Sequence, residues 1–208
     1  MDALHGTRVY LLLSIFVLLT YSWCALAQAE SKAAKPAEPG TTSQHDGQHD
    51  FDFIYGKWRM PNHRLVKRLA GSHEWDDFIS CDEGMPLAGG IGNIDILRTN
   101  YWKDFVGITV RTYDPQKGLW RLYWVDNRSS HGEIQPPVVG KFNGNVGVFE
   151  GKDTFNGKPI IVRFTWTINP RGSEVVANWE QAFSADDGKT WETNWKNEFI
   201  HDENCNPN

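Results

Sequence analysis

The chain has 208 residues, of which 40% are hydrophobic and 23% are charged, as is typical of one soluble globular domain. Its formal net charge at pH 7 is −5. Because binding to a phosphate backbone needs a basic surface, this charge argues against a general nucleic-acid-binding protein.

The first 27 residues have the pattern of an export signal. Arg8 precedes an apolar run over residues 9–21, and Ala25 and Ala27 supply the small residues of a cleavage site. We therefore expect cleavage after Ala27 and a secreted or periplasmic protein that keeps no membrane span. An uncleaved anchor is the alternative, because the apolar stretch approaches the roughly 20 residues that cross a bilayer.

Cleavage at this site would leave two cysteines, Cys81 and Cys205. In an oxidising compartment they could form one disulfide that ties an early strand to the C-terminal tail, and two unpaired thiols are the alternative. The sequence has no C-x-x-C pattern, so metal binding through sulfur is not expected.

Residues 28–50 are rich in small and polar residues without periodicity, which predicts a flexible linker before a domain over residues 51–208. In that domain apolar and polar residues alternate, as they do in half-buried β-strands. The expected strands cover residues 58–69, 74–82, 93–99, 105–113, 119–126, 138–152, 159–168, 175–184 and 190–200. Turn residues separate them, including Asn143-Gly144 inside the longest range. The pattern predicts an all-β fold of about nine or ten antiparallel strands, in a barrel or a sandwich.

Tryptophan is abundant, with ten residues in the chain. Alternation places several of them on one face of consecutive strands, where they could line a barrel interior and contact an apolar or aromatic ligand. Ordinary core packing is the alternative. The ligand-binding candidates are Trp58, Trp120, Trp124, Arg163, Trp166, Trp179, Trp191 and Trp195.

Two carboxylates are candidate acids or bases, because an inward-facing carboxyl would be desolvated and have a raised pKa. Asp126 has the strand parity of Trp124, whereas Glu180 and Arg163 lie opposite the tryptophans, on the expected solvent face. His201 is a candidate axial haem ligand, with a surface histidine as the alternative. Nucleotide-binding and metalloprotease motifs are absent from the sequence, and we expect no cofactor.

Seven segments together resemble a largely uncharacterised bacterial family with a lipocalin-like (calycin) β-barrel. They are FDFIYGKW (51–58), GNID (92–95), VRTYDP (110–115), WRLYW (120–124), PPVVGKF (136–142), GVFEG (147–151) and WEQAFSADDGKTWETNW (179–195). The resemblance implies a lipocalin-like antiparallel barrel with a cavity for a small ligand. It implies no particular reaction and no catalytic residues.

These observations lead to three functional hypotheses. The first is an exported protein that holds a small apolar or aromatic molecule in a tryptophan-lined barrel. The second is a barrel enzyme, an isomerase, cyclase or lyase, that uses a carboxylate as acid or base. The third is a haem-binding barrel. Fold alone does not choose among them.

Overall fold

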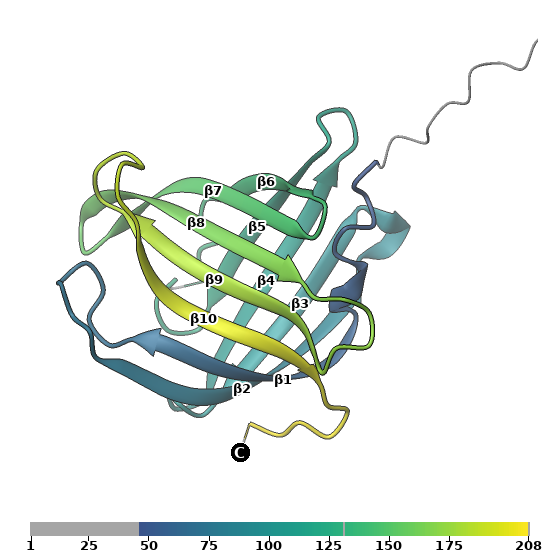
Figure 1. The fold of residues 1–208 in the computed structure, drawn as a ribbon, viewed down its shortest axis with the longest axis horizontal. Helices are drawn as coiled ribbons and strands as arrows, with labels where there is room; N and C mark the ends of the chain where they lie inside the picture. Colours follow the sequence, from purple (N-terminus) through teal and green to yellow (C-terminus); the bar gives the residue numbers. More distant parts are fainter. Residues whose placement is uncertain (1–45, 131, 208) are drawn as a thin grey trace, which may run out of the picture. The chain divides into compact units, whose positions relative to one another are not determined.

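Ten antiparallel strands form one closed barrel, which confirms the predicted all-β fold (Figure 1). The structure is a computed structural model that describes residues 46–130 and 132–207. The predicted export signal, residues 1–27, and residues 28–45 of the predicted linker lie outside this part. Each strand pairs with its neighbours in sequence, and the first strand closes the barrel against the last. Closure leaves no unpaired sheet edge.

The strands follow the alternation of the sequence closely. They are β1 (Gly56–Leu65), β2 (Trp75–Pro86), β3 (Gly92–Thr99), β4 (Phe105–Asp114), β5 (Leu119–Asp126), β6 (Val138–Asn143), β7 (Val146–Phe155), β8 (Lys158–Ile168), β9 (Val175–Ser184) and β10 (Glu192–His201). Two short 3₁₀ helices, η1 (Asp52–Ile54) and η2 (Ala88–Gly90), complete the fold. The expected strand over 138–152 is the hairpin β6–β7, because Gly144 at φ +63° turns the chain back.

A segment before β1 packs its apolar side chains into one end of the barrel, which we call the closed end. The ring of Phe51 is fully buried there, with its centroid 5.0–5.6 Å from four interior rings. These are the rings of Trp120, Phe142, Phe149 and Trp166. Ile54 is also fully buried, and its carbonyl passes so close to Gly84 of β2 that a Cβ there would lie 2.1 Å away.

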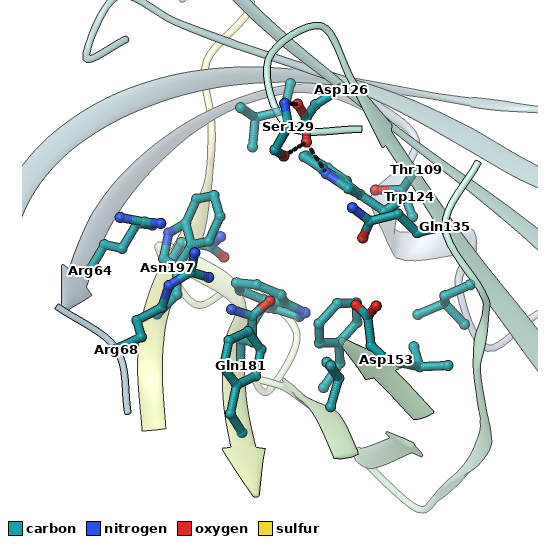
Figure 2. A pocket seen from close by; sticks show the side chains of 18 of the residues that line it. Arg64, Arg68, Thr109, Trp124, Asp126, Ser129, Gln135, Asp153, Gln181 and Asn197 are labelled. Atoms are coloured by element: carbon teal, nitrogen blue, oxygen red, sulfur yellow. Dashed lines mark hydrogen bonds between the residues drawn. The ribbon is translucent and has the colours of Figure 1, made fainter. Parts of the chain in front are cut away.

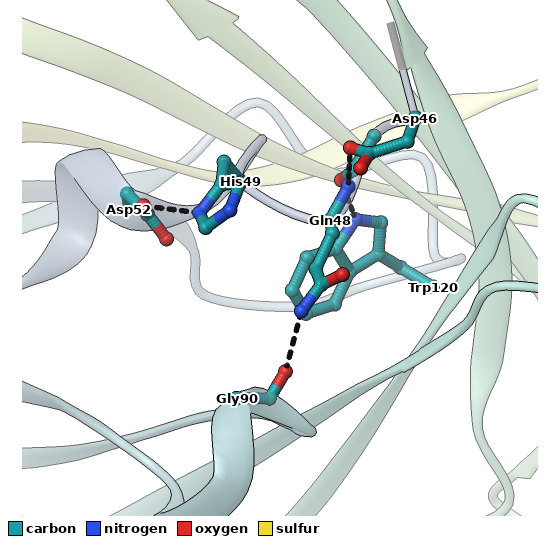
Figure 3. A network of polar contacts seen from close by, with 7 residues as sticks. Asp46, Gln48, His49, Asp52, Gly90 and Trp120 are labelled. Atoms are coloured by element: carbon teal, nitrogen blue, oxygen red, sulfur yellow. Dashed lines mark hydrogen bonds and ion pairs between the residues drawn. The ribbon is translucent and has the colours of Figure 1, made fainter. Parts of the chain in front are cut away.

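Polar contacts fix the same segment to the barrel (Figure 3). The indole N–H of Trp120 donates to the carbonyl of Gly47 at 2.9 Å, and the Gln48 amide donates to the carbonyl of Gly90 at 3.2 Å. His49 and Asp52 pair at 2.8 Å. Residues 46–50, predicted as linker, therefore contact the barrel directly.

The opposite end, which we call the open end, is bordered by the connections 66–74, 100–104, 127–137, 156–157 and 185–191. None of the helices in the described residues is long and apolar enough to cross a membrane. Beyond β10 the tail turns back along the barrel, where the backbone N–H of Asp202 donates to the carbonyl of Lys57 at 3.1 Å. A disulfide joins Cys205 of this tail to Cys81 on the outer face of β2.

This disulfide should contribute measurably to stability, because it joins positions 124 residues apart. Removing a native disulfide that constrains so long a loop in the unfolded chain costs about 2–5 kcal/mol. We expect the double variant Cys81→Ser, Cys205→Ser to lose about that much free energy of unfolding in urea titrations. A reductant should lower the wild-type value to that of the variant and leave the variant unchanged; equal values for oxidised wild type and variant would contradict the expectation.

Candidate functional site

A cavity of about 810 Å³ occupies the barrel interior and reaches the open end. Its lining includes loop residues from the open end, among them Tyr101, Arg128 and Ser129, which are solvent-exposed. It includes none of the turn residues of the closed end, where Phe51 and its neighbours fill the space. The cavity therefore has its entrance among the loops of the open end (Figure 2).

Aromatic side chains form one continuous wall of the cavity. Phe164 of β8 contacts Trp179 of β9 edge-on at 5.0 Å, and Trp179 contacts Trp195 of β10 at 5.7 Å. Trp195 in turn meets Trp102, which reaches across from the β3–β4 loop, at 6.0 Å. All four rings are only partly buried although they face the interior. Side chains therefore do not fill the barrel, and the aromatic surface is available to a bound molecule.

The opposite wall is shaped by a glycine. The indole of Trp124 lies over Gly107 of β4, where a Cβ would come within 2.1 Å of a ring carbon. Only glycine accommodates the ring in this position. Thr109, two residues along β4, and Leu122 of β5 line the cavity beside it.

A buried charged cluster lies deep in the cavity, next to the closed end. Arg111 of β4 pairs with Asp95 of β3 and donates to Asn93 at 3.2 Å. Its guanidinium also lies 5.1 Å from the ring centroid of Phe51 and 5.4 Å from that of Trp166. The cluster therefore connects the closed-end packing to the floor of the cavity.

Asp82 of β2 belongs to this cluster but lacks a partner of its own. It is 4% exposed, and neither carboxylate oxygen has a well-formed hydrogen bond within the described part of the chain. Burial, followed by repulsion from Asp95, raises the pKa of Asp82 well above its usual range. Attraction by Arg111 and the neighbouring backbone N–H of Glu83 offsets only part of this effect. The carboxyl of Asp82 therefore keeps its proton to higher pH than an exposed aspartate does, and in its protonated form it can donate a hydrogen bond into the cavity.

Two donors around Arg111 are also unpaired within the described residues. They are Nε of Arg111 and the indole Nε1 of Trp166, and both side chains border the cavity. Buried indole N–H groups ordinarily find a partner. The floor thus offers a carboxyl and two N–H groups to the polar end of a ligand.

Several of the tryptophan candidates border the cavity, and others do not. Trp124, Trp166, Trp179 and Trp195 line it. Trp58 and Trp120 are buried at the closed end instead and are not part of the lining. Both hold the N-terminal segment, since the Trp58 indole donates to the carbonyl of Ile54 at 2.7 Å and that of Trp120 to Gly47.

Trp191 and Arg163 lie on the outside of the barrel, against each other. The guanidinium of Arg163 sits 3.6 Å above the Trp191 ring centroid and pairs with Glu150. We expected Trp191 to share the face of Trp195, but the pairing of β10 with β9 shifts register between Thr193 and Trp195. A one-residue β-bulge moves every side chain that precedes it in the strand to the opposite face.

The two carboxylate candidates, Asp126 and Glu180, make contacts that stabilise the fold and are not placed to act as an acid or base. Glu180 is on the outer face, 3.1 Å from Lys196. Asp126 borders the cavity, but it accepts hydrogen bonds from the Trp124 indole, from both donors of Ser129 and from the backbone of Arg128 (Figure 2). Burial alone would raise the pKa of Asp126, yet these hydrogen bonds outweigh it and lower the pKa. Asp126 is thereby an ionised anchor of the turn after β5.

His201 is an exposed residue at the end of β10, stacked 3.9 Å from Trp58, and it does not border the cavity. Among the described residues no group of three or more His, Cys, Asp or Glu side chains is arranged to hold a metal ion.

The floor cluster was not singled out from the sequence, although its signal is present there. Asp82 has the strand parity of Phe78, and Asp95 that of Leu97, so alternation alone places both carboxylates inside. When alternation places charged residues of neighbouring strands on the interior face, they are expected to pair there. Arg111 is the third charged member of this cluster.

The sequence matches no protein-family model, and no curated protein is significantly similar to it.

Replacing Asp82 with asparagine tests the state of its carboxyl. A raised folded-state pKa means that wild type loses stability as the pH rises from about 4, where the unfolded carboxyl ionises. Asp82→Asn removes this loss. We expect it to be more stable than wild type by on the order of 1 kcal/mol at pH 8, and the difference to shrink towards pH 4.

Urea titrations at both pH values measure this difference. Asp77→Asn, on the exposed outer face of β2, is the control and should change stability by less than about 0.5 kcal/mol. A difference for Asp82→Asn that is the same at pH 4 and pH 8 would show that the carboxyl titrates normally.

Proposed function

We propose that this protein is an exported small-molecule-binding protein that holds an apolar or aromatic ligand inside its barrel. The observation that carries the proposal is the cavity of about 810 Å³ with partly exposed aromatic rings along its wall. Ligand pockets typically have volumes of about 300–1,000 Å³ and apolar walls with a few placed polar groups. The floor cluster supplies those polar groups.

Export to the periplasm or the extracellular space is part of the proposal. It is supported by the signal-like pattern of residues 1–27 and by the Cys81–Cys205 disulfide, since disulfides persist mainly in oxidising compartments. Membership of the bacterial lipocalin-like family that the sequence resembles agrees with the ten-stranded closed barrel.

A neutral apolar dye tests ligand binding directly. N-phenyl-1-naphthylamine should bind saturably, with increased dye emission and quenching of tryptophan fluorescence, because its rings would lie against Trp179 and Trp195. The variant Thr109→Trp places an indole in the cavity and should weaken binding about tenfold or more.

The matched control is Ile108→Trp, which adds the same side chain to the outer face of the same strand. It should bind the dye as wild type does, within about twofold. Equal weakening by both variants, or no saturable binding by wild type, would rule out the cavity as a ligand site.

A barrel enzyme is the second candidate, and Asp82 is the observation that favours it. A buried carboxyl whose pKa is raised by desolvation is a candidate general acid. In this version Asp82 would protonate a substrate held against the aromatic wall, and Asp126 and Glu180 would have no chemical role.

Native mass spectrometry distinguishes the enzyme from the binding protein. If Asp82 is the acid, protein purified under native conditions as Asp82→Asn should carry unreacted substrate, whereas wild type and Asp77→Asn should carry product or nothing. The same bound molecule in all three proteins would exclude turnover through Asp82.

A further inference from the structure

Three arginines converge on the open end of the cavity. Arg64 is the penultimate residue of β1, Arg68 belongs to the loop 66–74 and Arg128 to the loop 127–137. All three border the cavity. Segments far apart in the sequence thus bring three guanidinium groups to one entrance. Figure 2 shows Arg64 and Arg68 on the same side of the pocket, away from Asp126 and Asp153.

The aromatic wall holds these guanidinium groups in place. Arg64 and Arg128 both lie over Trp102, at 4.9 and 5.1 Å from its centroid, and Arg64 also approaches Trp195 at 5.4 Å. Arg68 lies over Phe155 at 4.7 Å. Stacking orients a guanidinium but leaves its in-plane N–H groups available.

None of the three arginines forms an ion pair with a carboxylate of the described residues. The Nε of Arg64 is buried and lacks a hydrogen-bond partner there. This contrasts with Arg163 on the outer face, which pairs with Glu150.

The nearby carboxylates attract these arginines at a distance but form their hydrogen bonds with other groups. Asp76 accepts a hydrogen bond from Tyr101, and Glu192 accepts one from the backbone N–H of Leu69 at 2.7 Å. Asp126 accepts hydrogen bonds from the backbone N–H of Arg128 and from Ser129 in the turn after β5. Asp153 borders the cavity from β7. The entrance therefore presents guanidinium N–H groups that have no ion-pair partner among the described residues.

Placing these charges together is unfavourable without an anion. Burial, and then repulsion by Arg64, lower the pKa of Arg68 to about 10. Burial also lowers the pKa of Arg64 and Arg128 adds repulsion, while Tyr101 and Asp76 offset part of this effect. A bound anion would offset the repulsion between the guanidinium groups, and the planar guanidinium matches the oxygens of carboxylate, sulfonate and phosphate groups.

We propose that the open end binds the anionic head group of an amphiphilic ligand whose apolar or aromatic body occupies the cavity. The proposal rests on the function proposed above and adds the ligand class: a single carboxylate, sulfonate or phosphate attached to an apolar or aromatic body. Arg64, Arg68 and Arg128 recognise the head group, and the aromatic wall recognises the body.

The test uses two probes of the same size that differ in charge, anthracene-2-carboxylate and anthracene-2-carboxamide. Titration calorimetry on wild type should show the carboxylate binding about tenfold or more tightly, because charge-assisted hydrogen bonds are the stronger kind. Raising the salt concentration should reduce this preference, since part of it is electrostatic attraction at an exposed entrance.

Two loop variants locate the effect. Arg68→Gln and Arg128→Gln should each reduce the preference for the carboxylate several-fold, and the double variant, which keeps only Arg64, should lose most of it. Arg68→Lys should keep part of the preference. The control Arg171→Gln removes the same charge from the exposed turn between β8 and β9, at the closed end, and should leave the preference intact. Thermal unfolding of each variant checks that it is folded.

The outcomes separate this inference from the function on which it rests. Equal binding of both probes by wild type would overturn the anion site and leave the cavity proposal standing. Failure of both probes to bind would overturn both. A preference that is undiminished in the folded double variant would also overturn the assignment to these arginines.

Discussion

The packing of Phe51 into one end of the barrel is the constraint on which the rest of the structure depends. A barrel of ten strands is wider than the eight-stranded size that side chains just fill. One end must therefore be closed by other means, or the interior would be open to water from both sides. Phe51 closes it through four ring contacts, and the indoles of Trp58 and Trp120 hold the segment that carries it. The cavity consequently has a floor, walls and an entrance.

Along the barrel axis the chemistry changes in order. The floor offers a carboxyl with a raised pKa, the wall offers aromatic faces, and the entrance offers guanidinium groups. An amphiphile with its charge at the entrance would place its anion against the guanidinium groups and its apolar body along the aromatic wall. The reverse orientation would bring an anion to Asp82 and Asp95, where one guanidinium already serves two carboxyls. Such a ligand would therefore enter with its apolar end first and keep its anionic head group at the entrance.

Sequence periodicity was sufficient for the strands and the fold class, because alternation and hairpin turns are local signals. Long-range contacts were not accessible in this way. Residues 46–50 have a linker composition, yet Gly47 and Gln48 are bound to strands and loops more than 40 positions away. Parity placed Trp166, Trp179 and Trp195 on the interior face, but it failed for Trp191, where a single bulge in β10 reverses the face. The floor cluster lies on the consecutively paired strands β2, β3 and β4, but its contacts with Phe51 and Trp166 join segments far apart in the sequence.

The site carries an energetic cost that the rest of the fold must offset. Asp82 is buried without a partner, and the arginines of the entrance repel one another, so both features lower the stability of the unliganded protein. The residue next to Asp82 is Cys81, which points to the opposite face of β2 and forms the disulfide with the C-terminal tail. The covalent link thus fastens the very strand whose inner face bears the unpaired carboxyl. A buried carboxyl without a partner, on a strand that a disulfide stabilises from its other face, is what we expect of a site retained for binding rather than for stability.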